Sequence, residues 1–262
     1  MKKLLITTII FTIGLLVLGV ITSAFGACLG CPDWPLCYGS VLPPETFTAK
    51  LEYYHRLLAA IVGIMSITIG ILLYRTQKLL SIALIFLIVS QVLIGGLTVI
   101  LKMPFIVSMA HTIFGILTYI ALIMLFKGNY KFQNNLWLTI FLLILIYYIW
   151  DGVVEKTASQ LACEDIFCLS SDLSNPKVLI QLIYKLIGIS IIITSIISLK
   201  EFSIDKLAFV LLAISIFISN ILIVKSLLSV SMVVLHYILL LSALTISLFK
   251  SIKTDSLETS KV

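Results

Sequence analysis

Charged residues are scarce in this sequence. Only 11% of its 262 residues are Asp, Glu, Lys or Arg, whereas 61% are hydrophobic, and the mean hydropathy is +1.20. So little charge cannot cover the surface of a water-soluble domain, so the composition excludes an ordinary soluble globule and is typical of a chain immersed in lipid. The net charge of +6 arises from basic residues in short segments between apolar runs, which indicates membrane topology, and we expect no nucleic-acid partner.

Long apolar runs fill most of the chain. The alternation of polar and apolar residues that a membrane β-barrel needs is absent, so the runs predict helices. We therefore predict an all-α integral membrane protein that crosses the lipid bilayer eight times. The predicted spans are residues 4–26, 51–73, 79–100, 106–126, 136–154, 179–199, 207–224 and 232–249.

The distribution of lysine and arginine orients these spans. Basic residues are more frequent on the side that carries both termini, which predicts cytoplasmic termini and a multi-pass location in the plasma (cytoplasmic) membrane. The two longest loops, 27–50 and 155–178, then lie on the outer face. The Lys2-Lys3 start also suits a cleaved secretory signal, but the length of the apolar run that follows favours a retained helix.

The two halves of the chain, 1–130 and 131–262, repeat one plan. Each has a helix, a long outer loop with a cysteine pair, and three further helices. The corresponding features are Cys31 and Cys37 with Cys163 and Cys168, Glu52-Tyr53-Tyr54-His55-Arg56 with Gln181-Leu182-Ile183-Tyr184-Lys185, and His111 with His236. We expect two tandem, pseudo-symmetric four-helix bundles.

The three histidines all lie in predicted spans, at nearly one depth below the outer surface. Polar side chains inside a membrane are costly and usually functional, although a single histidine can also serve as an interhelical hydrogen bonder. No carboxylate or thiolate cluster accompanies them at the spacing of a zinc site, whereas paired imidazoles suit the iron of a haem. The first half offers the pair His55 and His111; the second offers His236, with Tyr184 where its partner is expected.

Charged residues flank the candidate ligands. Glu52 lies three residues before His55 on the same helix face, where it can orient the imidazole or relay a proton, or simply neutralise Arg56. Arg56 and Lys185 occupy equivalent positions, and either pair with haem propionates or reach lipid headgroups.

The cysteines fall in the loops that we assign to the outer face, where disulfides persist. The pairs Cys31 with Cys37 and Cys163 with Cys168 are either structural links or redox pairs that pass electrons toward a haem, and the sequence leaves both open. Cys28 is expected to be a buried apolar residue.

One segment resembles a known family. The run Cys31-Pro-Asp-Trp-Pro-Leu-Cys37 followed by Glu52-x-x-His55-Arg56 resembles the haem A synthases, which are cytochrome oxidase assembly factors, and the tandem plan extends this similarity over almost the whole chain. The resemblance implies oxidation of a methyl group of haem O to a formyl group through successive hydroxylations. It also implies an electron donor and a possible haem O-forming partner enzyme.

The resemblance further implies roles for individual residues. His55 and His111 would coordinate the iron of the substrate haem O, Glu52 would be the acid needed for turnover, and His236 would be one of two ligands to a haem B cofactor. Tyr184 and Lys185 depart from the family pattern, which has His and Arg there, so the second haem site is degenerate: five-coordinate, differently ligated or lost.

Two other functions remain open. A haem-binding, quinol-linked electron carrier would use His55 and His111 but would give Glu52 no task. A membrane thiol oxidoreductase would make the cysteines primary and the histidines structural. A transporter is disfavoured because the spans lack the paired Gly/Pro breaks of midplane substrate sites.

Overall fold

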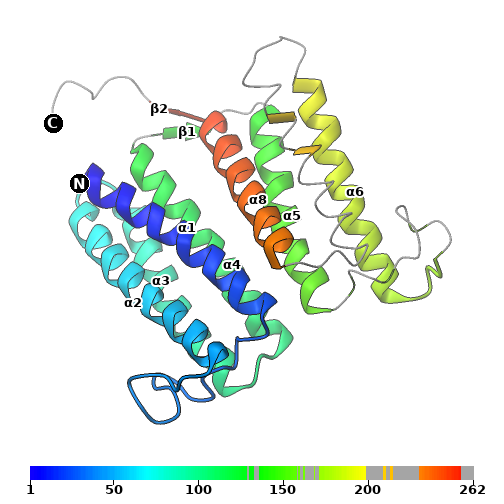
Figure 1. Cartoon of the computed structure of the whole chain (residues 1–262). Helices are drawn as coiled ribbons and strands as arrows, with labels where there is room; N and C mark the ends of the chain where they lie inside the picture. The colour runs from blue at the N-terminus through cyan, green and yellow to red at the C-terminus, as the bar shows by residue number, and fades with distance from the viewer. Residues whose placement is uncertain are drawn as a thin grey trace. The chain divides into compact units, whose positions relative to one another are not determined.

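The computed structural model describes residues 1–128, 130–132, 136–157, 159, 162, 168, 171–198, 209–210, 213–214 and 230–254. Within these residues seven helices are long and apolar enough to cross a membrane, so the chain is a multi-pass integral membrane protein (Figure 1). The helices are α1 (Lys2–Ala24), α2 (Phe47–Leu73), α3 (Lys78–Ile100), α4 (Phe105–Lys127), α5 (Leu136–Lys156), α6 (Pro176–Ile197) and α8 (Val230–Ser251).

Seven of the predicted spans coincide with these helices. The predicted span 207–224 lies largely outside the described residues, so a total of eight helices stays a prediction. Two three-residue strands, β1 (Tyr130–Phe132) and β2 (Ile252–Thr254), pair with each other and were not expected in an all-α chain.

Helix ends follow local capping chemistry more closely than hydropathy. Helix α6 begins at Pro176, where the missing amide N–H and fixed φ of proline suit a first helical position. The side chain of Asn175 caps it by accepting a hydrogen bond from the amide of Lys177 at 3.0 Å. Helix α2 begins at Phe47, four residues before its predicted span, so it extends past the end of the apolar run.

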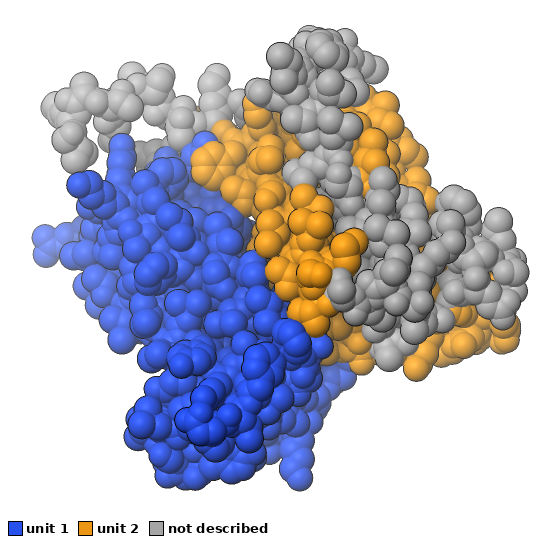
Figure 2. All heavy atoms as spheres, in the orientation of Figure 1, with its two compact units in different colours: residues 1–130 blue, residues 131–262 orange. Residues whose placement is uncertain are grey.

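The chain divides into two compact units, Met1–Tyr130 and Lys131–Val262 (Figure 2). In unit 1, α1 packs against α2 and α4, and α3 packs against the same two helices, so the four helices form a closed ring with α2 and α4 at opposite corners. In unit 2, α5 packs against both α6 and α8.

The apolar core of unit 1 draws on all four helices. Its buried members are Leu5 from α1, Ile69 from α2, Leu84 and Ile88 from α3, and Ala121, Leu122 and Leu125 from α4. These residues lie toward the start of α1 and the end of α2, so this end of the bundle is filled by apolar side chains. The candidate histidines lie toward the other end.

Candidate functional site

A disulfide loop covers the start of α2. Cys31 and Cys37 are joined by a disulfide, and both are buried against Ala49 and the partly buried Tyr53 of α2. The backbone before the disulfide also lies directly on the helix, because a Cβ at Gly30 would come within 2.3 Å of the carbonyl oxygen of Thr48. Glycine is therefore required there, and the loop is fixed to the helix.

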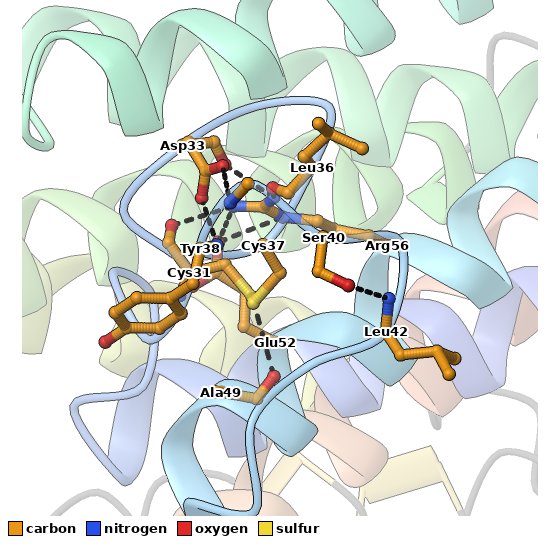
Figure 3. The surroundings of a disulfide bond; sticks show 11 residues. Cys31, Asp33, Leu36, Cys37, Tyr38, Ser40, Leu42, Ala49, Glu52 and Arg56 are labelled. Carbon is orange, nitrogen blue, oxygen red and sulfur yellow. Dashed lines mark hydrogen bonds and ion pairs between the residues drawn. A yellow bond between two sulfur atoms is a disulfide. The ribbon is translucent and has the colours of Figure 1, made fainter.

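Arg56 holds this loop through its guanidinium group (Figure 3). Its Nη1 donates to the carbonyl oxygens of Asp33 at 2.8 Å and Leu36 at 2.9 Å, and its Nη2 donates to that of Cys31 at 3.0 Å. Nε and Nη2 also donate to Oε1 of Glu52. An arginine has five N–H donors, and all five are used here.

Glu52 is the anion of this arrangement and is only 4% exposed. Besides its ion pair with Arg56, its Oε2 accepts a hydrogen bond from the backbone N–H of Cys31 at 2.8 Å. The carboxylate therefore connects the disulfide loop to α2, one helical turn from His55. The neutralisation of Arg56 that the sequence left open is present in the structure.

Asp33 organises the tip of the same loop. Its two carboxylate oxygens accept hydrogen bonds from the backbone N–H groups of Tyr38 at 2.6 Å and Gly39 at 2.7 Å. The bond from Gly39, then that from Tyr38 and the charge of Arg56, hold the pKa of Asp33 below its ordinary value. Tyr38 and Gly39 both have positive φ, at 55° and 71°, so the carboxylate stabilises a tight left-handed turn.

His55 and His111 lie inside unit 1 on helices at opposite corners of the ring. Each imidazole packs on a glycine of another helix: a Cβ at Gly19 of α1 would meet Cε1 of His55 at 3.1 Å, and one at Gly95 of α3 would meet Cε1 of His111 at 3.1 Å. Nδ1 of His55 is buried without a hydrogen-bond partner, which is the condition expected of a polar group in a ligand site.

Unit 2 places different chemistry at the corresponding position. The hydroxyl of Tyr184 on α6 donates to Oδ1 of Asp151 on α5 at 2.5 Å and lies 3.3 Å from Nε2 of His236 on α8. The same histidine nitrogen lies 3.9 Å from the carboxylate of Asp151. The ring of Tyr147 stacks on that of Tyr184, with centroids 4.4 Å apart. Tyr184 and His236 are each 1% exposed, so this cluster is fully enclosed.

The neighbours of Tyr184 follow the plan of unit 1 in part. Lys185, which matches Arg56, is buried and donates to Sγ of Cys168 at 3.4 Å. Cys168 is disulfide-bonded, and Cys163, its expected partner, lies outside the described residues, so that pairing stays a prediction. Gln181, which matches Glu52, is also buried. In both units a cation thus contacts a disulfide-bonded cysteine: Arg56 binds the carbonyl oxygen of Cys31, and Lys185 binds Sγ of Cys168.

Asp151 was not among the residues predicted from the sequence. It was included in the predicted span 136–154, where a carboxylate inside an apolar run is itself a signal of function or pairing. Its partners come from two other helices, so only the folded arrangement shows what it binds.

The fold and these sites define a helical membrane protein whose first unit holds two histidines inside its helix bundle and a disulfide-closed loop at the start of α2. Residues 2–50, which contain that loop, match the family model described as COX15-CtaA, cytochrome oxidase assembly protein. The N-terminal part of the chain is therefore similar to this family, in agreement with the resemblance to the haem A synthases in its sequence.

Curated relatives agree with this assignment. The chain is 33% identical to a "Heme A synthase" of Shewanella oneidensis over 43% of this chain and 40% of that protein. It is 29% identical to one of Shouchella clausii over 51% and 47%, and 23% identical to one of Bacillus licheniformis over 66% and 64%, respectively. The chain thus spans less than two thirds of the length of each of these relatives.

Proposed function

We propose that this chain is a haem A synthase, which oxidises a methyl group of haem O to a formyl group for cytochrome oxidase assembly. The observation that carries the proposal is the pair His55 and His111, which lie inside one four-helix unit and pack on Gly19 of α1 and Gly95 of α3. Two imidazoles from different helices would hold the iron of a bound haem. The names of the curated relatives support the same reaction.

The iron of a bound haem would supply the oxidising chemistry, because no protein side chain can oxidise a methyl group. The chain's own residues bind and orient the substrate. Gly19 and Gly95 leave room for the two imidazole rings to pack closely on α1 and α3. Rings locked in this way would hold the bound haem in a fixed orientation, and positioning a single methyl group for reaction requires this.

Glu52 is the proposed acid for turnover. It lies one helical turn from His55 and is hydrogen-bonded to the loop through Cys31, so it sits between the outer loop and the histidine pair. A carboxylate held this way can take up or release a proton near the substrate during oxidation. Arg56 then holds Glu52 and the loop in place; because all five of its donors are used there, this role is better supported than pairing with a haem propionate.

The proposed topology places the cysteine loops on the outer face and both termini in the cytoplasm, as the charge distribution favours. The protein would receive haem O from a haem O-forming enzyme in the same bilayer and would take electrons from a donor. In the second unit His236 matches one expected haem B ligand, whereas Tyr184 and Lys185 stand where the family has His and Arg, so that site is degenerate.

A haem-binding electron carrier is the first alternative, and Glu52→Gln separates it from the synthase. We expect this change to abolish haem A formation while haem O stays bound, because the amide cannot exchange a proton. A matched control is Glu45→Gln, which removes an acid from the exposed part of the same loop. If Glu52→Gln forms as much haem A as the control, Glu52 is not the acid needed for turnover, and the electron carrier is favoured.

A thiol oxidoreductase is the second alternative. The Cys31–Cys37 disulfide is buried, with its cysteines 0% and 2% exposed, so an exchanging thiolate has poor access to it. This favours a structural link over a redox pair. The double variant Cys31→Ser, Cys37→Ser separates the two classes. If it still forms haem A, the thiol oxidoreductase is excluded. If it loses both haem A formation and all thiol-disulfide turnover, the thiol oxidoreductase is favoured.

A further inference from the structure

The buried cluster of Asp151, Tyr184 and His236 takes one residue from each of three helices of unit 2: α5, α6 and α8. Tyr184 donates to Asp151 at 2.5 Å, and its oxygen lies 3.3 Å from Nε2 of His236. A buried carboxylate in an apolar bundle needs such partners, because an isolated charge there is strongly unfavourable. The cluster therefore satisfies its own polar groups without any ligand.

A haem between Tyr184 and His236 does not fit this arrangement. The two donor atoms that would approach the iron from opposite sides are separated by a hydrogen-bond distance, so no atom lies between them. Tyrosine binds iron as a phenolate, whereas the hydroxyl of Tyr184 keeps its proton to donate to Asp151. The ring of Tyr147, stacked on Tyr184, occupies the space on one face of that side chain.

Unit 1 differs at each of these points. His55 is partly exposed and its Nδ1 has no hydrogen-bond partner, whereas His236 is 1% exposed and lies within reach of both Tyr184 and Asp151. Both imidazoles of unit 1 pack on glycines, so no side chain of α1 or α3 intervenes at those points. Unit 1 therefore has the features of a ligand site, whereas unit 2 has a closed polar core.

We propose that unit 2 binds no haem and that the Asp151–Tyr184–His236 cluster replaces a haem as the link among α5, α6 and α8. Among the residues that the structure describes, the one site that then fits a haem is the substrate site of unit 1. This inference rests on the proposed function for the occupancy of unit 1, whereas the linking role of the cluster stands on the contacts of unit 2 alone.

The haem count per chain tests the first part. The full chain is purified from membranes that also contain a haem O-forming enzyme, and its haem is measured as the pyridine complex and by mass. We expect at most one haem per chain, lost in the double variant His55→Ala, His111→Ala and retained in His236→Ala. Two haems per chain, or a haem that survives in the double variant and disappears in His236→Ala, would overturn the proposal.

Thermal unfolding in detergent tests the second part, and it stays informative if no haem binds at all and the proposed function fails. Tyr184→Phe and Asp151→Leu should each lower the midpoint by several degrees, on the order of 4–10 °C, because each leaves a buried polar partner unsatisfied. The combined variant should lose clearly less than the two shifts added together. Tyr148→Phe, at a buried tyrosine of α5 whose hydroxyl has no hydrogen bond among the described contacts, is the matched control and should shift the midpoint little. Additive shifts, or shifts no larger than the control's, would overturn the linking role.

Discussion

The guanidinium of Arg56 should determine how tightly the disulfide loop stays closed. Arg56→Lys keeps the positive charge but replaces five donors in a planar fork by three at one point. At least two of the hydrogen bonds to Glu52, Cys31, Asp33 and Leu36 are then lost. Bonds to charged groups contribute about 1.5–3 kcal/mol each, so loop opening becomes easier by about 3 kcal/mol.

Hydrogen exchange of the loop amides measures this change directly. A cost of about 3 kcal/mol corresponds to exchange on the order of 100-fold faster at the backbone N–H groups of Cys31, Tyr38 and Gly39. The matched control is Lys50→Ala, which breaks the ion pair with Glu45 at the same end of α2. Because Glu45 is 92% exposed, that pair is worth about 0–1 kcal/mol, and the control should accelerate exchange less than about fivefold.

The comparison between these two variants shows whether Arg56 holds the loop closed. If Arg56→Lys changes exchange no more than Lys50→Ala does, the five hydrogen bonds do not hold the loop. Arg56 would then be available for another partner, such as a haem propionate. Fast amide exchange in Arg56→Lys, with little change in the exchange rate of the control, supports the conclusion that Arg56 holds the loop closed.

Further changes test the loop tip and the imidazole packing. Because the bond from Gly39 lowers the pKa of Asp33, the turn should keep its full stability above about pH 4 and lose it as the pH falls through the lowered pKa. Amide exchange in the turn should therefore rise in acid, and Asp33→Asn should abolish this rise. The same pH profile in Asp33→Asn and the unchanged protein would contradict this role of Asp33. Gly19→Ala should displace the ring of His55, since its Cβ would lie 3.1 Å from Cε1, and should weaken haem O binding severalfold in a spectroscopic titration. Gly14→Ala on the same helix, with open space around its Cβ, should leave binding unchanged, and equal effects of the two changes would refute the packing argument.

Much of the fold was predictable because lipid imposes a simple rule on sequence. A span must be long and apolar, so hydropathy identified seven helices that the structure contains. Helix ends were less predictable, since α2 extends into Phe47–Lys50 and α6 begins at a capped proline, and neither feature is a matter of hydropathy. The two short strands, β1 and β2, pair residues far apart in the chain, which local patterns do not reveal.

The candidate site was predictable in composition and less so in contacts. Sequence spacing placed Glu52 and His55 on one helix face, but the carbonyl acceptors of Arg56 come from a loop whose path depends on the folded disulfide. Asp151 gave a signal as a lone acid in an apolar run, yet its partners Tyr184 and His236 lie on other helices. Contacts between side chains on different helices depend on how the helices pack, and local sequence patterns do not reveal that packing.

The most direct test of the central claim is the haem extracted from membranes that contain this chain and a haem O-forming enzyme. We predict haem A with the intact chain and none with His55→Ala or His111→Ala, while Tyr54→Phe, at an exposed neighbour of His55, keeps normal product. Haem O bound without any haem A, in the presence of a competent electron donor, would contradict the synthase and favour an electron carrier. Haem A formed equally well by the histidine variants would contradict the assigned site.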